Sequence, residues 1–147
     1  MTGADRVRVL VVAGDAGTRA ALREHLEADG MVARAEAGDQ AAAIAAISRE
    51  RPDLCLLVDG PPLDAMAATA ALRDRAPDVP VVLLGGEPTD ETLLAAVTAG
   101  AAGYLDVDAA GQRLTAALSD VLAGCPAFPR RLATLLLEDL RDPHRSR

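Results

Sequence analysis

Five short apolar segments alternate with longer amphipathic segments along this chain, and no other feature restricts the fold as strongly. The apolar segments are rich in valine and leucine and cover residues 7–13, 31–36, 54–58, 79–84 and 103–105. Short runs of this composition, bounded by glycine, proline or aspartate, predict β-strands. The amphipathic segments cover residues 17–28, 39–50, 63–75, 90–99 and 109–123. Their apolar residues recur every three or four positions, which predicts helices.

Strands and helices that alternate in this way build βαβ units. The alternation therefore predicts an α/β fold with a doubly wound, five-stranded parallel sheet, (βα)5, and helices on both faces. Ligands of such sheets bind beyond the carboxyl ends of the strands. Residues 13–15, 58–60, 85–86 and 106–108 follow the predicted strands, so we expect any chemistry to lie among them.

A further helix is predicted after the fifth repeat. Gly124, Pro126 and Pro129 interrupt the pattern, and residues 130–141 then place four leucines on one stripe of a helix. These leucines are Leu132, Leu135, Leu136 and Leu140. We expect one domain over residues 1–125 and a helix or linker over residues 126–147. The leucine stripe is expected to pack either on the domain's own surface or on a partner.

The composition excludes several classes of protein. A chain of 147 residues, half of them apolar, is long enough for one self-supporting core. No apolar run is long enough to span a bilayer and no signal sequence opens the chain, so we expect no membrane association and a cytoplasmic location. The net charge of −7 argues against direct nucleic-acid binding by this domain, because duplex affinity depends on cations that contact phosphates.

The sequence offers no recognisable catalytic or metal-binding arrangement. Cys55 and Cys125 are far apart in the chain, and His25 and His144 are its only histidines. Neither a metal cluster nor a Ser/His/Asp or Cys/His pairing is therefore expected. Both cysteines are predicted to be packing residues. We expect no enzyme activity, no metal and no cofactor.

Four segments resemble bacterial response-regulator receiver domains of the NarL/FixJ type. They read RVRVLVVAGDAGTRAALREHL, RPDLCLLVDGPPLD, DVPVVLLGG and TAGAAGYLDVDA, and the match in order and spacing covers about residues 6 to 140. The resemblance implies a flavodoxin-like receiver fold with an extra C-terminal helix. It also implies a role in two-component signal transduction and transcription regulation. In that family the last helix leads to a helix-turn-helix domain, which would be the part that binds DNA.

The chain departs from that family where its phosphorylation chemistry resides. Family members have an acidic pair after the first strand, a phosphoacceptor aspartate after the third, Thr or Ser after the fourth and lysine after the fifth. The corresponding positions here hold Ala13 and Gly14, Val58, Gly85 and Val107. All fifteen basic residues are arginine, so the chain has no lysine at all. Mg²⁺ prefers carboxylate, water and phosphate oxygens, and these side chains offer it none.

Only Tyr104, at the family's switch-aromatic position, is retained. We therefore predict a degenerate pseudo-receiver that regulates or dimerises a transcription regulator independently of phosphorylation, with a homodimer as the expected assembly. Dimers in this family form through the first and fifth helices, or through the fourth helix, fifth strand and fifth helix. The sequence does not choose between these surfaces.

A shifted register is one alternative. In it Asp59 is phosphorylated in place of Val58, and Asp15 replaces the lost acidic pair. Neighbouring residues of a strand point to opposite sides, which argues against a shift of one position. Asp15 also suits a helix cap, and Asp59-Gly60-Pro61 is typical of a turn.

A small-molecule sensor is the second alternative, from a different class. Small residues at the strand ends predict an apolar crevice, with Tyr104 and Asp59 as its polar contacts. Its walls would be Ala13, Gly14, Val58, Gly85 and Gly86. If the loops collapse inward, no such site exists. A third alternative is a stand-alone adaptor that binds a partner through the leucine stripe.

Overall fold

The computed structural model describes residues 6–110 and 113–141, and its core is a sheet of five parallel strands. The strands are β1 (Arg8–Val12), β2 (Val32–Ala37), β3 (Leu54–Val58), β4 (Val81–Gly85) and β5 (Gly103–Asp106). Their order in the sheet is β2-β1-β3-β4-β5. The chain thus reverses its direction of winding between β1 and β3, as in doubly wound sheets.

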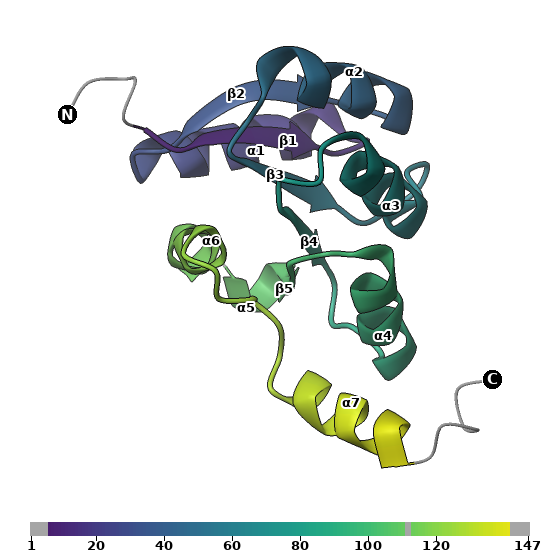
Figure 1. The fold of residues 1–147 in the computed structure, drawn as a ribbon. Coiled ribbons are helices and arrows are strands. Elements are labelled where there is room, and N and C mark those ends of the chain that lie inside the picture. The colour runs from purple at the N-terminus through teal and green to yellow at the C-terminus, as the bar shows by residue number, and fades with distance from the viewer. Residues whose placement is uncertain (1–5, 111–112, 142–147) are drawn as a thin grey trace.

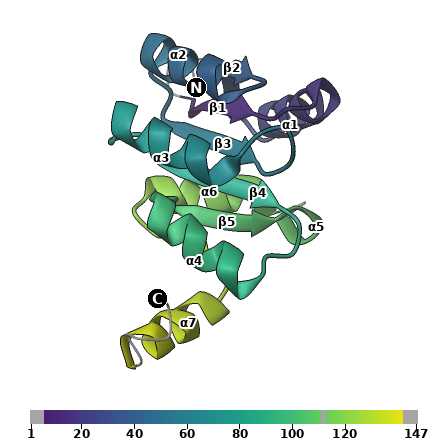
Figure 2. The ribbon, with the colours of Figure 1, turned by 90° about the vertical axis from the view of Figure 1, so that its right-hand side faces the viewer.

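Seven helices accompany the sheet in the described part of the chain. They are α1 (Ala16–Ala28), α2 (Gln40–Glu50), α3 (Ala65–Arg75), α4 (Asp90–Ala99), α5 (Val107–Ala110), α6 (Leu114–Leu122) and α7 (Arg131–Arg141). Helices α2, α3 and α4 cover one face of the sheet, and α1 and α6 cover the other (Figures 1 and 2). The flavodoxin-like receiver fold predicted from the sequence is therefore confirmed.

Polar side chains fix where the helices begin. Asp15, Asp39, Asp64 and Thr89 each accept a hydrogen bond from the backbone N–H three residues later, at the start of α1, α2, α3 and α4. Such caps satisfy N–H groups that have no partner within the helix. The predicted capping role of Asp15 is confirmed, and α4 ends at Gly100 in the left-handed conformation.

Both faces of the sheet are buried, which is why its strands are continuous apolar runs. On β1, Val9 and Val11 pack with α1 and α6, whereas Leu10 and Val12 pack with α2, α3 and α4. Successive side chains of a strand point to opposite faces, so one strand supplies both core layers. No helix among the described residues is both long and apolar enough to cross a membrane.

The fifth helix begins earlier than predicted. The sequence predicts a helix over residues 109–123, and the structure has helix over Val107–Ala110 (α5) and Leu114–Leu122 (α6); residues 111–112 between them lie outside the described part of the chain. The Asp106 carboxylate accepts a hydrogen bond of 2.9 Å from the Asp108 N–H, so the chain turns into helix directly after β5. Leu114, Leu118 and Val121 of α6 supply the apolar repeat on which the prediction was based.

The segment after α6 extends the sheet at its β5 edge. Ala127 forms a parallel bridge with Gly103: its carbonyl accepts from the Tyr104 N–H at 2.9 Å, and its N–H donates to Ala102 at 3.1 Å. A Cβ atom on Gly103 would lie 2.6 Å from the Ala127 carbonyl oxygen, so glycine is required for this approach. We call residues 125–130 the edge segment. It delivers α7 to the outer side of α4 (Figure 1).

Candidate functional site

The carboxyl ends of β1, β3 and β4 lie side by side and hold the residues singled out in the sequence. Ala13 follows β1 and is buried, Val58 is the last residue of β3, and Gly85 is the last residue of β4. Gly14 is exposed in the next loop, and Val107 begins α5 with an exposed side chain. None of these side chains has an oxygen or nitrogen atom. Within the described residues, no group of three or more His, Cys, Asp or Glu side chains is arranged to hold a metal ion.

Tyr104 occupies the space beside Gly85. A Cβ atom added to Gly85 would lie 2.3 Å from the Tyr104 hydroxyl oxygen, which is far below a normal contact distance. The Tyr104 side chain is buried, and its hydroxyl donates a hydrogen bond of 2.9 Å to the Gly86 carbonyl. The position that holds Thr or Ser in the related family is thus filled here by the tyrosine ring.

Pro62 closes the neighbouring part of the edge. A Cβ atom added to Gly14 would lie 3.1 Å from Pro62 Cδ, and the Pro61 carbonyl oxygen lies 3.7 Å from the same point. The loop after β3 therefore rests on the loop after β1. At both positions a larger neighbour packs into the space that the small residue leaves, so the predicted crevice is narrowed there and its use as a ligand site stays a prediction. Of the three glycines at this edge, Gly14, Gly85 and Gly86, only Gly86 has no atom within 4 Å of an added Cβ.

Asp59 lies next to this closed edge. Its Cβ is 3.3 Å from the point where a Gly85 Cβ would be. Burial raises the pKa of the Tyr104 phenol above its usual value, and the negative charges of Asp59 and Asp106 raise it further. Val58 packs toward α1 and α6, whereas Asp59 lines a cavity between α3 and α4. The structure brings Asp59, Gly85 and Tyr104 together, and the two neighbours Val58 and Asp59 face opposite sides of the sheet.

Asp15 acts as a local cap. A single carboxylate oxygen of Asp15 accepts hydrogen bonds of 2.8 Å from both the N–H and the hydroxyl of Thr18. These bonds, first the one from the Thr18 side chain, hold the pKa of the Asp15 carboxyl below its usual value. The predicted turn after β3 is also present, with the Leu63 N–H donating to the Gly60 carbonyl at 3.0 Å.

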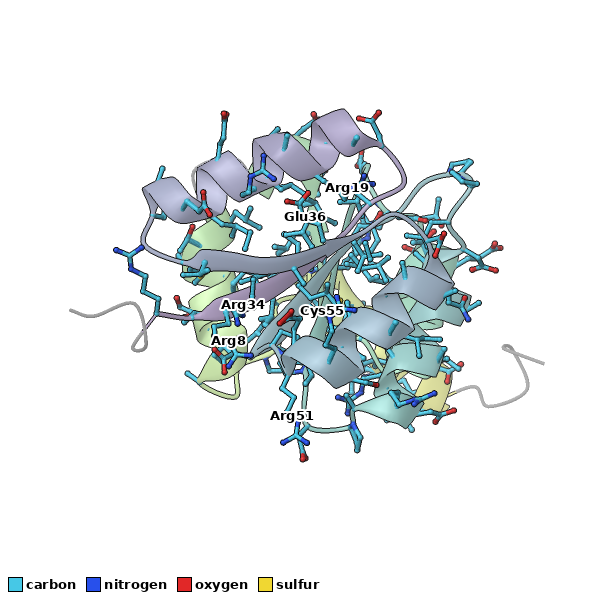
Figure 3. All side chains as sticks on the ribbon, turned by 90° about the horizontal axis from the view of Figure 1, so that it is seen from above. Arg8, Arg19, Arg34, Glu36, Arg51 and Cys55 are labelled. Atoms are coloured by element: carbon cyan, nitrogen blue, oxygen red, sulfur yellow. The ribbon has the colours of Figure 1, made fainter. Side chains whose placement is uncertain are left out.

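Arg19 is a cation near this edge that the sequence analysis missed. Its guanidinium donates a hydrogen bond of 2.6 Å to the Ala13 carbonyl and lies 3.7 Å from the Glu36 carboxylate. Figure 3 shows Arg19 on α1 near Glu36 of β2. Arg19 therefore binds the outer, β2 side of β1, away from β3. The sequence feature that could have indicated this contact is the position of Arg19, one turn into the helix that follows β1.

Asp59 and Tyr104 line two different cavities. The first has about 350 Å³ and includes Asp59, Asp64, Met66 and Thr92. The second has about 470 Å³ and lies between β5, α6 and the edge segment; both aromatic residues of the chain, Tyr104 and Phe128, line it. The predicted crevice in which Asp59 and Tyr104 would contact one ligand together is therefore replaced by two separate hollows.

The two cysteines have different environments. Cys55 lies inside the sheet (Figure 3), where burial raises its pKa to about 12. Cys125 is exposed at the start of the edge segment, so its prediction as a packing residue was wrong. Its neighbours Gly124 and Pro126 are exposed as well.

Comparison with known relatives places this geometry in a family. Residues 9–119 match the family model described as response regulator receiver domain. The chain is 36% identical over 107 residues to the DNA-binding transcriptional activator DevR/DosR of Mycobacterium tuberculosis. That alignment covers 72% of this chain and 49% of DevR/DosR, so the chain spans about half the length of this relative.

Solved structures agree with the fold. A two-component response regulator of the LuxR family from Aurantimonas sp. superimposes with a TM-score of 0.81 at 23% identity, over 94% of this chain and 100% of that chain. The receiver domain of the response regulator NarL from Mycobacterium tuberculosis gives a TM-score of 0.73 at 28% identity, over 81% and 98%. The chain therefore belongs to the response regulator receiver domain family.

Proposed function

We propose that this receiver domain regulates a transcription factor without being phosphorylated. The observation that supports it most is the position of Tyr104, whose hydroxyl takes the space of any side chain at Gly85. Tyr104 is thus held in a buried, inward position, with its ring beside Gly85, by contacts that exist without a phosphoryl group. A conformation that already forms without a ligand leaves phosphorylation little population to shift, so this contact supports a module that acts without it.

The chemistry of the edge supports the same proposal. Phosphoryl transfer needs Mg²⁺ and cations to neutralise the charge on the transferred group. Gly14 and Val58 supply no ligand oxygen from their side chains, and the chain has no lysine to pair with an acyl phosphate. Arg19, the cation near β1, already contacts Ala13 and Glu36.

We further propose that DNA is contacted by a region outside this chain. DevR/DosR is described as a DNA-binding transcriptional activator, and this chain corresponds to about half of its length. With a net charge of −7, the chain would repel phosphates. The edge segment and α7 lie on β5 and α4. A homodimer would therefore use the opposite side, formed by α1 and α6.

Phosphorylation of Asp59 is the first competing function, and its closeness to Gly85 and Tyr104 favours it. The test is intact-mass spectrometry after incubation with acetyl phosphate and Mg²⁺, with the receiver domain of a phosphorylatable relative as positive control. We expect no added phosphate. A single phosphate that maps to Asp59 and is lost in Asp59→Asn would overturn the proposal.

Small-molecule sensing is the second competing function. The 470 Å³ cavity beside Tyr104 is lined by apolar atoms of Leu105, Ala117, Phe128 and Pro129 and could hold a small apolar ligand. A metabolite that raises the melting temperature of the unaltered chain but not of a Phe128→Ala variant would support this function. The absence of any such shift across a metabolite panel would leave the phosphorylation-independent module as the simpler account.

A further inference from the structure

A groove between α4 and α7 is a hollow on the described surface that the proposed function does not use. It has a volume of about 780 Å³ and is lined by residues of these two helices only. One end is closed by the first turn of α7, where Leu132 is buried and Arg131 contacts the Pro88 carbonyl and pairs with Asp90 at 3.6 Å. From that attachment α7 extends past α4 on the same side of the sheet (Figure 2).

The lining of the groove is apolar in the middle and acidic at its rims. Its apolar residues are Leu94, Ala95, Val97, Leu135 and Leu136. Leu136 remains 38% exposed, so the groove has apolar area that this chain does not cover. Carboxylates stand on both helices: Asp90 and Glu91 on α4, and Glu138 and Asp139 on α7. Glu91 and Asp139 form no ion pair with other described residues.

This pattern selects one kind of occupant. The carboxylates repel nucleic acids and anionic lipid surfaces, and the same acidic face of a second copy would be repelled too. A ligand with an apolar stripe flanked by cations would bury Leu94, Leu135 and Leu136. Its cations would pair with the carboxylates of Glu91 and Asp139. A hollow walled by two helices suits a third helix, the mode by which amphipathic helices bind in grooves.

We propose that the α4–α7 groove binds a basic amphipathic helix of a separate partner protein. The groove lies on the side of the sheet opposite α1 and α6, so a partner helix and a homodimer contact would not compete. The proposal does not depend on whether the domain is phosphorylated.

The probe is a synthetic helical peptide of about four turns, with leucines every three or four residues and arginines on both flanks. A peptide with glutamate for arginine and one with the same composition in scrambled order are its controls. We expect the leucine–arginine peptide alone to bind in a fluorescence anisotropy titration. In ¹⁵N–¹H spectra of the unaltered chain, the shifted amides should be those of α4 and α7. Absence of binding, or shifts confined to other elements, would overturn the proposal.

Charge reversal provides the matched comparison. Glu91→Arg with Asp139→Arg should weaken peptide binding about tenfold or more, because both rims lose their attraction. Asp74→Arg with Asp78→Arg changes the net charge by the same amount at exposed positions at the end of α3 and just after it, outside both the groove and the α1–α6 side. This control should bind as the unaltered chain does, and circular dichroism checks that both variants fold. Equal losses in the two variants would show attraction to net charge alone and contradict a site in the groove.

Discussion

At the scale of single residues, Tyr104 and Gly85 share one space that only one of them can fill. The tyrosine ring is inward because position 85 has no Cβ, and its hydroxyl is satisfied by the Gly86 carbonyl. A buried hydroxyl without such a partner would cost about 1–3 kcal/mol, so the bond helps to keep the ring in place. The glycine that removes a family hydroxyl thus also creates the pocket for the aromatic ring.

The ionisation of Tyr104 can be measured directly, because the chain contains one tyrosine and no tryptophan. We predict that ultraviolet absorbance gives a titration midpoint above about 10, the usual tyrosine value. Asp59→Asn should lower the midpoint by removing a negative charge, whereas Asp64→Asn should not. The folded state holds this proton more tightly than the unfolded state, so its contribution to stability is complete below about pH 10 and declines as the pH rises through the folded pKa. A midpoint at or below the usual value would contradict an inward Tyr104.

Gly85→Ala tests the shared space. The added Cβ would meet the hydroxyl at 2.3 Å, so the ring must leave or the backbone must shift. We expect a loss of about 1–3 kcal/mol in the free energy of unfolding and a Tyr104 midpoint that falls toward the usual value. Gly86→Ala is the matched control, since its Cβ would have no neighbour within 4 Å. Equal behaviour of the two variants would count against the steric argument.

The cysteines give a further prediction at this scale. Thiol reagents attack the thiolate, and burial raises the pKa of Cys55 to about 12, whereas Cys125 is exposed. A colorimetric thiol assay should therefore label one thiol of the folded chain, at Cys125, and both thiols after denaturation. Rapid labelling of Cys55 in the folded protein would show that the sheet opens more readily than its packing indicates.

At the scale of elements, the edge segment and α7 are held by few contacts and make the most sensitive test of packing. Leu132 is buried against the α2–α3–α4 core, whereas Leu140 is 77% exposed on the same helix. Leu132→Ala should lower the free energy of unfolding by about 2–3 kcal/mol, and Leu140→Ala by less than about 0.5 kcal/mol. Urea denaturation measures both. A similar cost for the two variants would mean that α7 is not docked on α4.

Much of the element pattern could be predicted from the sequence, because local composition decides it. The bounds of β3 and α4 agree to the residue, since apolar runs there lie between clear turn residues such as Pro52 and Gly100. The start of helix directly after β5 was not predicted, because the bond that the Asp106 carboxylate accepts from the Asp108 N–H sets where helix begins. The bridge between Ala127 and Gly103 was missed because it joins positions that are distant in the sequence.

The sequence predicted where the candidate site lies, but not which side chains fill it. Parallel strands bring Ala13, Val58 and Gly85 to one edge, and the order of strands in the sequence is enough to say so. Which neighbour fills the space left by small residues depends on three-dimensional packing. Nothing in the sequence indicated that Tyr104 would take the space at Gly85 or that Pro62 would rest on Gly14.

At the scale of the whole molecule, the domain presents two unlike sides. The edge of β5 and the outer side of α4 are covered by residues 125–141, whereas the described helix α7 lies on the face of the sheet opposite α1 and α6. If homodimers form through α1 and α6, charge or size changes at exposed residues of these helices, such as Ala21→Arg, should shift the sedimentation profile toward monomer. Ala133→Arg, on the exposed side of α7, is the control that should leave the profile unchanged.

The central claim is that the receiver holds its conformation without phosphorylation. The most direct measurement is a ¹⁵N–¹H spectrum of the unaltered chain titrated with beryllofluoride and Mg²⁺, which together mimic an acyl phosphate on aspartate. We predict that the amides of Gly86 and Tyr104 do not move, because Gly14 and Val58 supply no carboxylate to hold Mg²⁺ or beryllofluoride and Tyr104 is already inward. Saturable shifts of these two amides, abolished in Asp59→Asn, would contradict the account and show that the domain still switches by phosphorylation.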